Sequence, residues 1–154
     1  MALFKSILHN IGVVIVGFGV ALLGAAIDSG LGVSHFQSTF TTALGCVLLV
    51  AGFLVRAWAT DRFYERRMKV ISLVPQNALI TSGPYRFSRN PLYLGGNVFI
   101  FFGAALLLGS PAALFITALH LPLVDLFIRR EEKQLEQQFG EDWLRYKARV
   151  RRWI

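Results

Sequence analysis

The chain has 154 residues, of which 55% are hydrophobic and 16% are charged. This composition is too apolar for an ordinary soluble domain, and a single cysteine, Cys46, excludes a disulfide within the chain. The formal net charge of +7 is explained by basic residues beside anionic lipid headgroups, and no motif for nucleic-acid recognition accompanies it. We therefore expect one membrane-embedded domain over residues 1–154 and no nucleic-acid partner.

Four apolar segments are long enough to cross the hydrocarbon core of a membrane, for which a helix needs about 17 to 25 residues. They cover residues 7–27, 39–59, 92–108 and 111–128. None shows the alternation of a strand, and inside lipid only helices and closed barrels satisfy every backbone hydrogen bond. The sequence therefore predicts an all-α integral membrane bundle of four transmembrane helices. Glycines and a short loop suit residues 1–60 to a scaffold of two closely packed helices.

Basic residues lie almost entirely on one side of the predicted bundle. Of the 16 lysines and arginines, only Arg56 lies inside a segment; the others precede the first segment, lie between the second and third, or follow the fourth. Lysine and arginine near helix ends stay in the cytoplasm, so both termini and the loop 60–90 are expected there. We expect a multi-pass protein of a bacterial inner membrane.

The loop 60–90 is long for a compact bundle, and loops of this length are more often functional than idle. Its first stretch, DRFYERRMKV, is suited to extend the second helix into the headgroup layer, before Pro75 and Gly83 force turns. Asn90 followed by Pro91 predicts the start of the third helix, with the asparagine side chain capping free backbone N–H groups.

The stretch GSP at 109–111 predicts a tight helical hairpin, because glycine suits a helix end and proline suits the first turn of the next helix. The hairpin returns the end of the fourth helix, with the run RREE at 129–132, to the side of Asn90. One helix end attracts anions and the other attracts cations. A zwitterionic or sulfonium-bearing ligand therefore fits between them.

After the fourth helix, apolar residues recur at helical spacing among charged ones: Leu135, Phe139, Trp143, Tyr146 and Val150. This spacing predicts an amphipathic cytoplasmic tail that lies on the membrane surface, with Gly140 dividing it into two short helices. Aromatic residues also gather at membrane–water interfaces as belts. This interpretation applies to Tyr85, Tyr93, Trp143 and Tyr146, and we favour it over ligand contact for Trp143.

Ionisable groups inside membrane segments are costly and are usually paired or functional. Arg56 and Asp125 lie at similar depth, so we expect an ion pair between the second and fourth helices, with Asp125 facing a ligand pocket as the alternative. His120, near mid-membrane, either lines an acceptor tunnel or packs as a satisfied histidine. His9 and His35 are expected on the surface, and no metal-ligand spacing occurs.

Two stretches carry a resemblance to a known family. GPYRFSRNPLYLG at 83–95 and RREEKQLEQQFGEDWLRYKARVRRWI at 129–154 resemble the isoprenylcysteine carboxyl methyltransferases and bacterial phospholipid N-methyltransferases, which are integral membrane methyltransferases. The family pattern is Gly-Pro-Tyr-Arg, Arg-His-Pro, a helical hairpin and a Glu-Glu pair, and its order and spacing are specific. The resemblance implies a cofactor-binding core over residues 80–154 and S-adenosylmethionine in a pocket that faces the cytoplasm.

The resemblance also implies roles for individual residues. The cofactor pocket would be lined by Tyr85, Arg89, Asn90, Pro91, Leu92 and Tyr93, while Glu131 and Glu132 would hold the amino group of the methionine part. Asn90 replaces the histidine of the family pattern, so it cannot titrate or shuttle a proton. The plainer interpretation is that Asn90 only caps a helix, and that the two glutamates are solvated and paired with basic residues of their own helix.

Methyl transfer from a sulfonium is an in-line displacement, so positioning and a dry pocket supply much of the acceleration. An amine acceptor must also lose a proton, and the sequence does not choose between Glu131, Glu132 and Tyr93 as its base. Arg89 is a further catalytic candidate. The expected acceptor-binding residues are Arg86, Arg129 and Arg130, which suit a lipid phosphate, and His120.

We therefore expect S-adenosylmethionine-dependent methyl transfer to a lipid or small hydrophobic acceptor at the cytoplasmic membrane face. A phospholipid amine is the leading acceptor, ahead of a prenylcysteine carboxyl group and a small thiol. A nicotinamide-dependent membrane reductase is the alternative enzyme, and a lipid-binding scaffold is the non-enzymatic alternative. A homodimer is also considered, because a four-helix bundle is thin.

Overall fold

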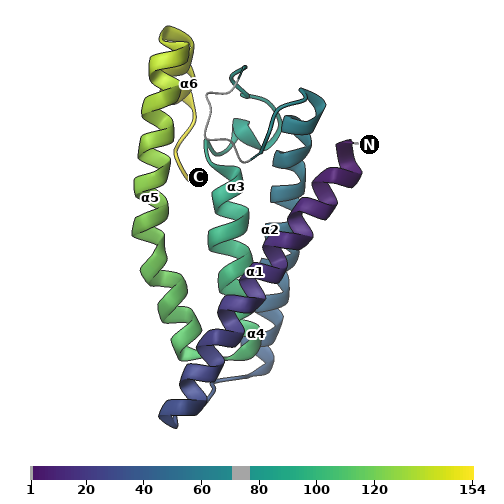
Figure 1. The fold of residues 1–154 in the computed structure, drawn as a ribbon, viewed down its shortest axis with the longest axis vertical. Coiled ribbons are helices and arrows are strands. Elements are labelled where there is room, and N and C mark those ends of the chain that lie inside the picture. The colour runs from purple at the N-terminus through teal and green to yellow at the C-terminus, as the bar shows by residue number, and fades with distance from the viewer. Residues whose placement is uncertain (1, 71–76) are drawn as a thin grey trace.

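The computed structural model describes residues 2–70 and 77–154, which form an all-helical bundle (Figure 1). Its elements are α1 (Ala2–Leu31), α2 (Thr39–Glu65), the 3-10 helix η1 (Gly83–Arg86), α3 (Pro91–Tyr93), the π-helix η2 (Leu94–Ile100), α4 (Phe101–Leu108), α5 (Pro111–Phe139) and α6 (Glu141–Arg149). The elements α3, η2 and α4 form one continuous helix. Within the described ranges, four helices are long and apolar enough to cross a membrane, so the predicted fold class is confirmed.

The first two helices extend beyond the predicted apolar segments. α1 begins well before residue 7, and α2 continues to Glu65, which confirms that the second helix runs on into the charged stretch. A capping box fixes the start of α2: the Thr41 N–H donates to Ser38 Oγ at 3.1 Å, and the Ser38 N–H donates to Thr41 Oγ1 at 2.9 Å. The turn expected at Pro75 lies outside the described residues.

Glycines set the distance between α2 and the third membrane helix. A Cβ added at Gly52 would lie 2.6 Å from the carbonyl oxygen of Gly95, and one added at Gly95 would lie 2.7 Å from the carbonyl oxygen of Gly52. This close approach brings Arg56 against α3, where its Nη1 donates to the carbonyl oxygen of Leu92 at 2.7 Å. In a regular α-helix the carbonyl oxygen of Leu92 would accept the Gly96 N–H. Here, however, the chain winds as the π-helix η2 over these residues.

At the end of the bundle away from the two termini, the end of α1 packs beside the start of α5 (Figure 1). The buried Asp28 accepts hydrogen bonds from Ser110 Oγ at 2.5 Å and from the Ala112 N–H at 3.1 Å. Ser110 Oγ in turn accepts from the Ala113 N–H at 3.0 Å, so the two side chains together cap α5. The left-handed turn at Gly109, with φ 60°, confirms the predicted hairpin.

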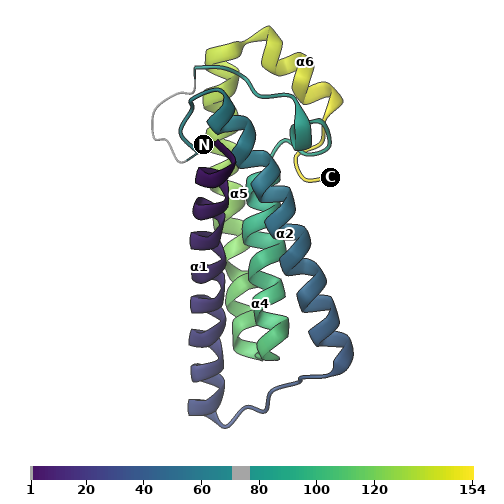
Figure 2. The same ribbon diagram turned by 90° about the vertical axis from the view of Figure 1, so that its right-hand side faces the viewer.

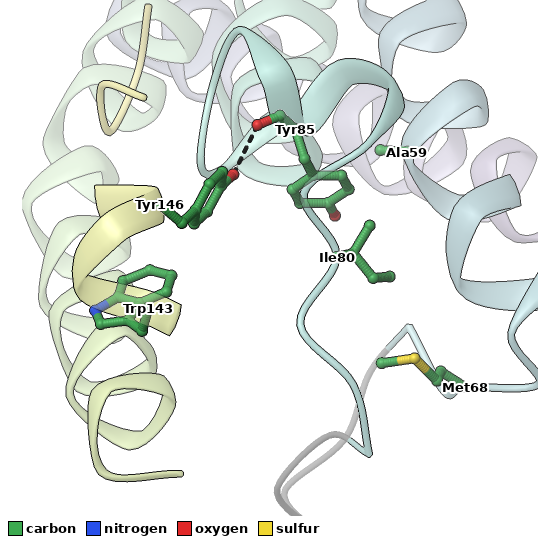
Figure 3. Close-up of a cluster of buried hydrophobic side chains, with 6 residues drawn as sticks. All are labelled: Ala59, Met68, Ile80, Tyr85, Trp143 and Tyr146. Carbon is green, nitrogen blue, oxygen red and sulfur yellow. Dashed lines mark hydrogen bonds between the residues drawn. The ribbon is translucent and has the colours of Figure 1, made fainter. Parts of the chain in front are cut away.

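The opposite end of the bundle is covered by α6 and the segment around η1 (Figure 2). Six buried residues form a core there: Ala59, Met68, Ile80, Tyr85, Trp143 and Tyr146 (Figure 3). The Tyr146 hydroxyl donates to the carbonyl oxygen of Tyr85 at 2.7 Å, which joins α6 to η1. Gly140, with φ 47°, separates α5 from α6 as expected.

The apolar side of the tail therefore faces the protein. Trp143 is only 1% exposed, so its interpretation as an interfacial belt residue was wrong. Helical spacing alone cannot distinguish a face that packs on lipid from one that packs on the rest of the chain, because both burials are driven by the same apolar area.

Candidate active site

A cavity of about 610 Å³ lies beside α6, at the end of the bundle where α3 begins. Its lining comes from α1, α2, η1, the third membrane helix, α5 and α6, so segments from the whole chain build it. Seven of the expected cofactor-binding residues line it: Tyr85, Arg89, Asn90, Leu92, Tyr93, Glu131 and Glu132. The remaining one, Pro91, is fully buried and is not part of the lining.

The hairpin brings the residues around the start of α3 into contact with the later turns of α5. The Tyr93 hydroxyl donates to Glu131 Oε2 at 3.1 Å, and Arg89 Nη2 lies 3.2 Å from Glu132 Oε1. The structure thus places Asn90 and the two glutamates on one cavity, as the hairpin predicted. The roles of these residues stay predictions.

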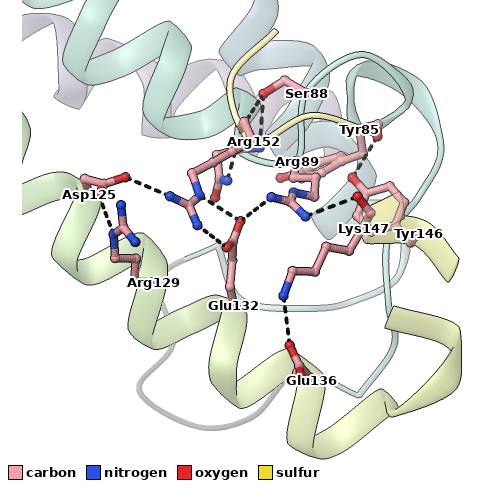
Figure 4. A network of polar contacts seen from close by, with 11 residues as sticks. Tyr85, Ser88, Arg89, Asp125, Arg129, Glu132, Glu136, Tyr146, Lys147 and Arg152 are labelled. Carbon is pink, nitrogen blue, oxygen red and sulfur yellow. Dashed lines mark hydrogen bonds and ion pairs between the residues drawn. The ribbon is translucent and has the colours of Figure 1, made fainter. Parts of the chain in front are cut away.

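Glu132 is 6% exposed and is held by two arginines (Figure 4). Arg89 contacts Oε1, while Arg152 donates from Nη2 to Oε2 at 2.8 Å and from Nε to Oε1 at 3.2 Å. A buried carboxylate needs such partners, because its transfer from water is otherwise costly. The interpretation of Glu132 as a solvated residue paired within its own helix was therefore wrong. Nothing in the sequence distinguishes Arg152 from its basic neighbours, so this residue was missed.

The arginines expected to bind the acceptor do not line this cavity. Arg86 and Arg130 are exposed, and neither belongs to the cavity wall. Arg129 pairs with Asp125 at 2.6 Å and lines a second cleft of about 360 Å³. The cleft shares Glu132 with the main cavity, so this carboxylate stands between the two.

His120 lies behind the cavity wall. Its Nε2 lies 3.1 Å from Asn97 Oδ1, and its ring stacks on Phe101 at 5.4 Å between centroids. Asn97 and Phe101 line the cavity, whereas His120 does not. Its Nδ1 is also 2.6 Å from the carbonyl oxygen of Thr117, so both ring nitrogens have partners. These contacts favour the packing interpretation of His120.

The expected ion pair between Arg56 and Asp125 was wrong. The buried Arg56 places its Nη2 3.2 Å from His9 Nε2, and Asp125 pairs with Arg129 and Arg152. The reason is the order of packing, since α2 packs mainly on η2 and α4, whereas α5 packs mainly on α1. Arg56 and His9 both line the cavity, so the surface position expected for His9 was also wrong. The two scaffold helices thus contribute to the candidate site.

Asn90 marks the start of α3 as predicted, but its side chain does not cap the helix. Its Nδ2 donates instead to the carbonyl oxygen of Arg152 at 3.3 Å, and its N–H donates to Ser88 Oγ at 3.1 Å. A cap would use the side-chain oxygen as acceptor, whereas this bond uses the NH₂ group as donor, and sequence spacing gives no sign of the partner in the C-terminal segment.

The cavity wall offers hydrogen-bond donors and aromatic faces. Three buried N–H groups of lining residues have no acceptor within the described part of the chain: Arg56 Nε, Arg89 Nε and Trp143 Nε1. The Arg89 guanidinium lies 5.7 Å from the centroid of the Trp143 ring, within range of a cation–π contact. Burial raises the pKa of the Tyr85 hydroxyl, which keeps it neutral. Together with two carboxylates, this wall suits a ligand that carries a flat ring, acceptor atoms and a positive charge.

These features define a membrane protein with a polar and aromatic cavity where the two ends of a helical hairpin meet. The chain belongs to the phospholipid methyltransferase family, which matches it over residues 40–142, from the start of α2 into α6. A protein-S-isoprenylcysteine O-methyltransferase of Saccharomyces cerevisiae is 33% identical over 117 residues, which cover 71% of this chain and 46% of the relative. The chain therefore spans about half the length of that relative. No solved structure matches the chain.

Proposed function

We propose that the protein transfers a methyl group from S-adenosylmethionine to a lipid acceptor at the cytoplasmic face of a membrane. One observation carries the proposal: residues 89–93 and the pair Glu131 and Glu132 share a single cavity, in a chain of the phospholipid methyltransferase family. The cytoplasmic orientation rests on the basic residues, which gather at the helix ends around this cavity.

The cavity residues fit the chemical groups of S-adenosylmethionine. Its carboxylate suits Arg89, whose buried Nε has no acceptor among the described residues, and its ammonium group suits the carboxylate of Glu132. Its adenine suits the aromatic faces of Tyr85 and Trp143. When bound, the cofactor supplies a methyl group on a positively charged sulfur for in-line displacement by the acceptor.

Glu131 is the better candidate for the base that an amine acceptor needs. The Tyr93 hydroxyl donates to one of its oxygens and orients the carboxylate, and no basic residue of the described chain forms an ion pair with it. Glu132, by contrast, forms ion pairs with Arg89 and Arg152 and accepts two N–H groups of Arg152. Two guanidinium groups stabilise its charge, so Glu132 is suited to binding rather than to proton transfer.

Arg56 suits the anionic group of the acceptor. Its partners are His9 and a backbone carbonyl, and within the described ranges no carboxylate pairs with it. A buried cation without a counter-charge is costly, so a phosphate or carboxylate at this position compensates it. The wall beyond Arg56 comes from one face of α1, including Val13 and Val16, and Val16 is 56% exposed toward the surface that lipid would cover. The apolar chain of the acceptor therefore enters beside α1.

A phospholipid amine is the acceptor that this arrangement favours. Arg56 provides a cation for the phosphate, and Glu131 provides a base for the ammonium group. The family description points the same way. A prenylcysteine carboxyl group is the second candidate, because the yeast relative carries that name and because a carboxylate also suits Arg56. A carboxylate acceptor needs no base, so the effect of replacing Glu131 on kcat distinguishes an amine acceptor from a carboxylate acceptor.

The test uses purified protein in vesicles that contain phosphatidylethanolamine, with S-adenosylmethionine labelled in its methyl group. We expect label in the phospholipid and none in N-acetyl-S-farnesylcysteine supplied to the same vesicles; the reverse outcome overturns the choice of acceptor. Calorimetry with S-adenosylmethionine and with S-adenosylhomocysteine should show saturable binding. Absence of binding for both overturns the proposed enzyme.

A second measurement tests the base. Glu131→Gln should lower kcat by about 10²-fold or more, because the proton of the amine then has no acceptor, while the affinity for the acceptor changes little. Glu136→Gln is the matched control, since Glu136 lies on the same helix and its pair with Lys147 is outside the cavity. An unchanged kcat in Glu131→Gln removes this residue from the proposed chemistry.

A further inference from the structure

The C-terminal segment after α6 runs back along the residues that precede α3. The N–H of Arg89 donates to the carbonyl oxygen of Arg151 at 3.0 Å. The carbonyl oxygen of Arg152 accepts from Ser88 Oγ at 3.2 Å and from Asn90 Nδ2 at 3.3 Å. The consecutive residues 88–90 are thus hydrogen-bonded to Arg151 and Arg152 of the C-terminal segment. This pairing fixes the position of the backbone that carries the Arg152 side chain.

The Arg152 side chain joins two acidic residues of α5 (Figure 4). Its Nη2 and Nε donate to the two oxygens of Glu132 at 2.8 and 3.2 Å, and its Nη1 donates to Asp125 Oδ1 at 3.3 Å. The two acids are about two helical turns apart and so lie on one face of α5. The planar guanidinium is therefore bidentate on Glu132 while it reaches Asp125, a geometry that a lysine ammonium cannot reproduce. The hydrogen bond with Glu132 raises the pKa of Arg152, which keeps the guanidinium charged.

Glu132 is held from two sides. Arg89, which lines the cavity, contacts Oε1, whereas Arg152 lines the second cleft and is not part of the cavity wall. A carboxylate has about four lone-pair directions; two of them accept N–H groups of Arg152, and the ion pair with Arg89 lies beside Oε1. Among the described residues, Oε2 contacts Arg152 Nη2 alone, so a lone-pair direction of this oxygen stays free.

We propose that Arg152 is a positioning residue, which holds Glu132 from the side of the second cleft so that the free lone pair of its carboxylate is available to the ammonium group of the cofactor. This inference rests on the proposed function, in which the cavity binds S-adenosylmethionine. Arg152 acts through Glu132 and touches neither cofactor nor acceptor. When the guanidinium of Arg152 is removed, the Glu132 carboxylate is free to turn toward Arg89, and the ammonium site loses its orientation.

The experiment compares substitutions at two neighbouring arginines. Arg152→Met removes the guanidinium and keeps an unbranched apolar side chain, while Arg152→Lys keeps the charge without the bidentate contact. Arg151→Met is the matched control, because Arg151 is exposed and only its backbone carbonyl is used in the contacts with the motif. Calorimetry with S-adenosylhomocysteine, which carries the same ammonium group, measures affinity, and thermal unfolding in detergent checks that each variant is folded.

We expect Arg152→Met to weaken the binding of S-adenosylhomocysteine by about tenfold or more, Arg152→Lys to show an intermediate loss, and Arg151→Met to bind as the wild type does. In a Glu132→Gln background, Arg152→Met should have little further effect, because the two residues act as one unit. Wild-type affinity in Arg152→Met overturns the inference, and so does a full additional loss in the Glu132→Gln background.

Two further outcomes keep the question decidable. Should Arg152→Met fail to fold, Arg152→Lys decides by itself, because an affinity equal to that of the wild type contradicts a bidentate positioning role. Should the wild-type protein bind no S-adenosylhomocysteine, the proposed function fails rather than the role of Arg152. The failure of one is thus distinguishable from the failure of the other.

Discussion

Replacing Glu132 by glutamine tests whether the buried ion network stabilises the fold. Arg89 Nη2 lies 3.2 Å from Glu132 Oε1 in an ion pair, and the carboxylate accepts two N–H groups from Arg152 at 2.8 and 3.2 Å. Glutamine keeps the size and one acceptor oxygen, but it turns an NH₂ group toward a guanidinium and leaves both arginines without this counter-charge. Arg89 suffers more, because its side chain is 8% exposed, whereas that of Arg152 is 25% exposed.

The magnitude follows from these contacts. Removing one partner of a fully buried ion pair costs about 3–5 kcal/mol. Arg152 is able to turn toward Asp125 and water, so its share is smaller, and we expect Glu132→Gln to lower the unfolding free energy by about 3 kcal/mol. For a chain of this size, 1 kcal/mol shifts Tm by about 2–4 °C, so Tm should fall by roughly 6–12 °C.

The assay measures the protein that stays folded in detergent after heating, by size-exclusion chromatography. Glu136→Gln is the control, because its ion pair with Lys147 at 3.1 Å is exposed and such pairs contribute at most about 1 kcal/mol. A Tm of Glu132→Gln within about 3 °C of this control refutes the reasoning, since the two arginines would then not depend on the buried carboxylate.

Three other predictions concern helix packing, a helix cap and a buried hydrogen bond. Gly24→Leu should lower both Tm and the affinity for S-adenosylhomocysteine, because an added Cβ would clash with the Ala113 backbone and so separate α1 from α5. Gly19→Leu should change neither, because an added Cβ there meets no other described element within 4 Å. Asp28→Asn should lower the unfolding free energy by about 1–2 kcal/mol, measured by thermal unfolding, because it weakens the cap of α5. Tyr146→Phe should cost about 1 kcal/mol in the same assay, because a buried carbonyl of η1 loses its donor.

The local features of the fold were predictable from the sequence. Four membrane helices follow from the length of four apolar segments, and the hairpin follows from Gly109 and Pro111, because helix length and turn chemistry depend on neighbouring residues only. The approach of Asn90 to Glu131 and Glu132 follows in turn, since a tight hairpin returns the chain to the end of the bundle where the third membrane helix starts. The family was recognisable for the same reason, through the order of its motifs on either side of the hairpin.

What the sequence by itself determined is thus the set of elements and the end of the bundle where the site forms. Only the tertiary structure decided which charges meet there. Nothing in the local sequence marks Arg152 out from Arg149 and Arg151, yet of these three arginines only Arg152 pairs with Glu132. Arg56 turned to His9 rather than to Asp125, because the close approach of Gly52 fixed α2 against the third membrane helix. Partner choice among buried charges depends on which helix faces pack together, and that choice is made by contacts between residues far apart in the chain.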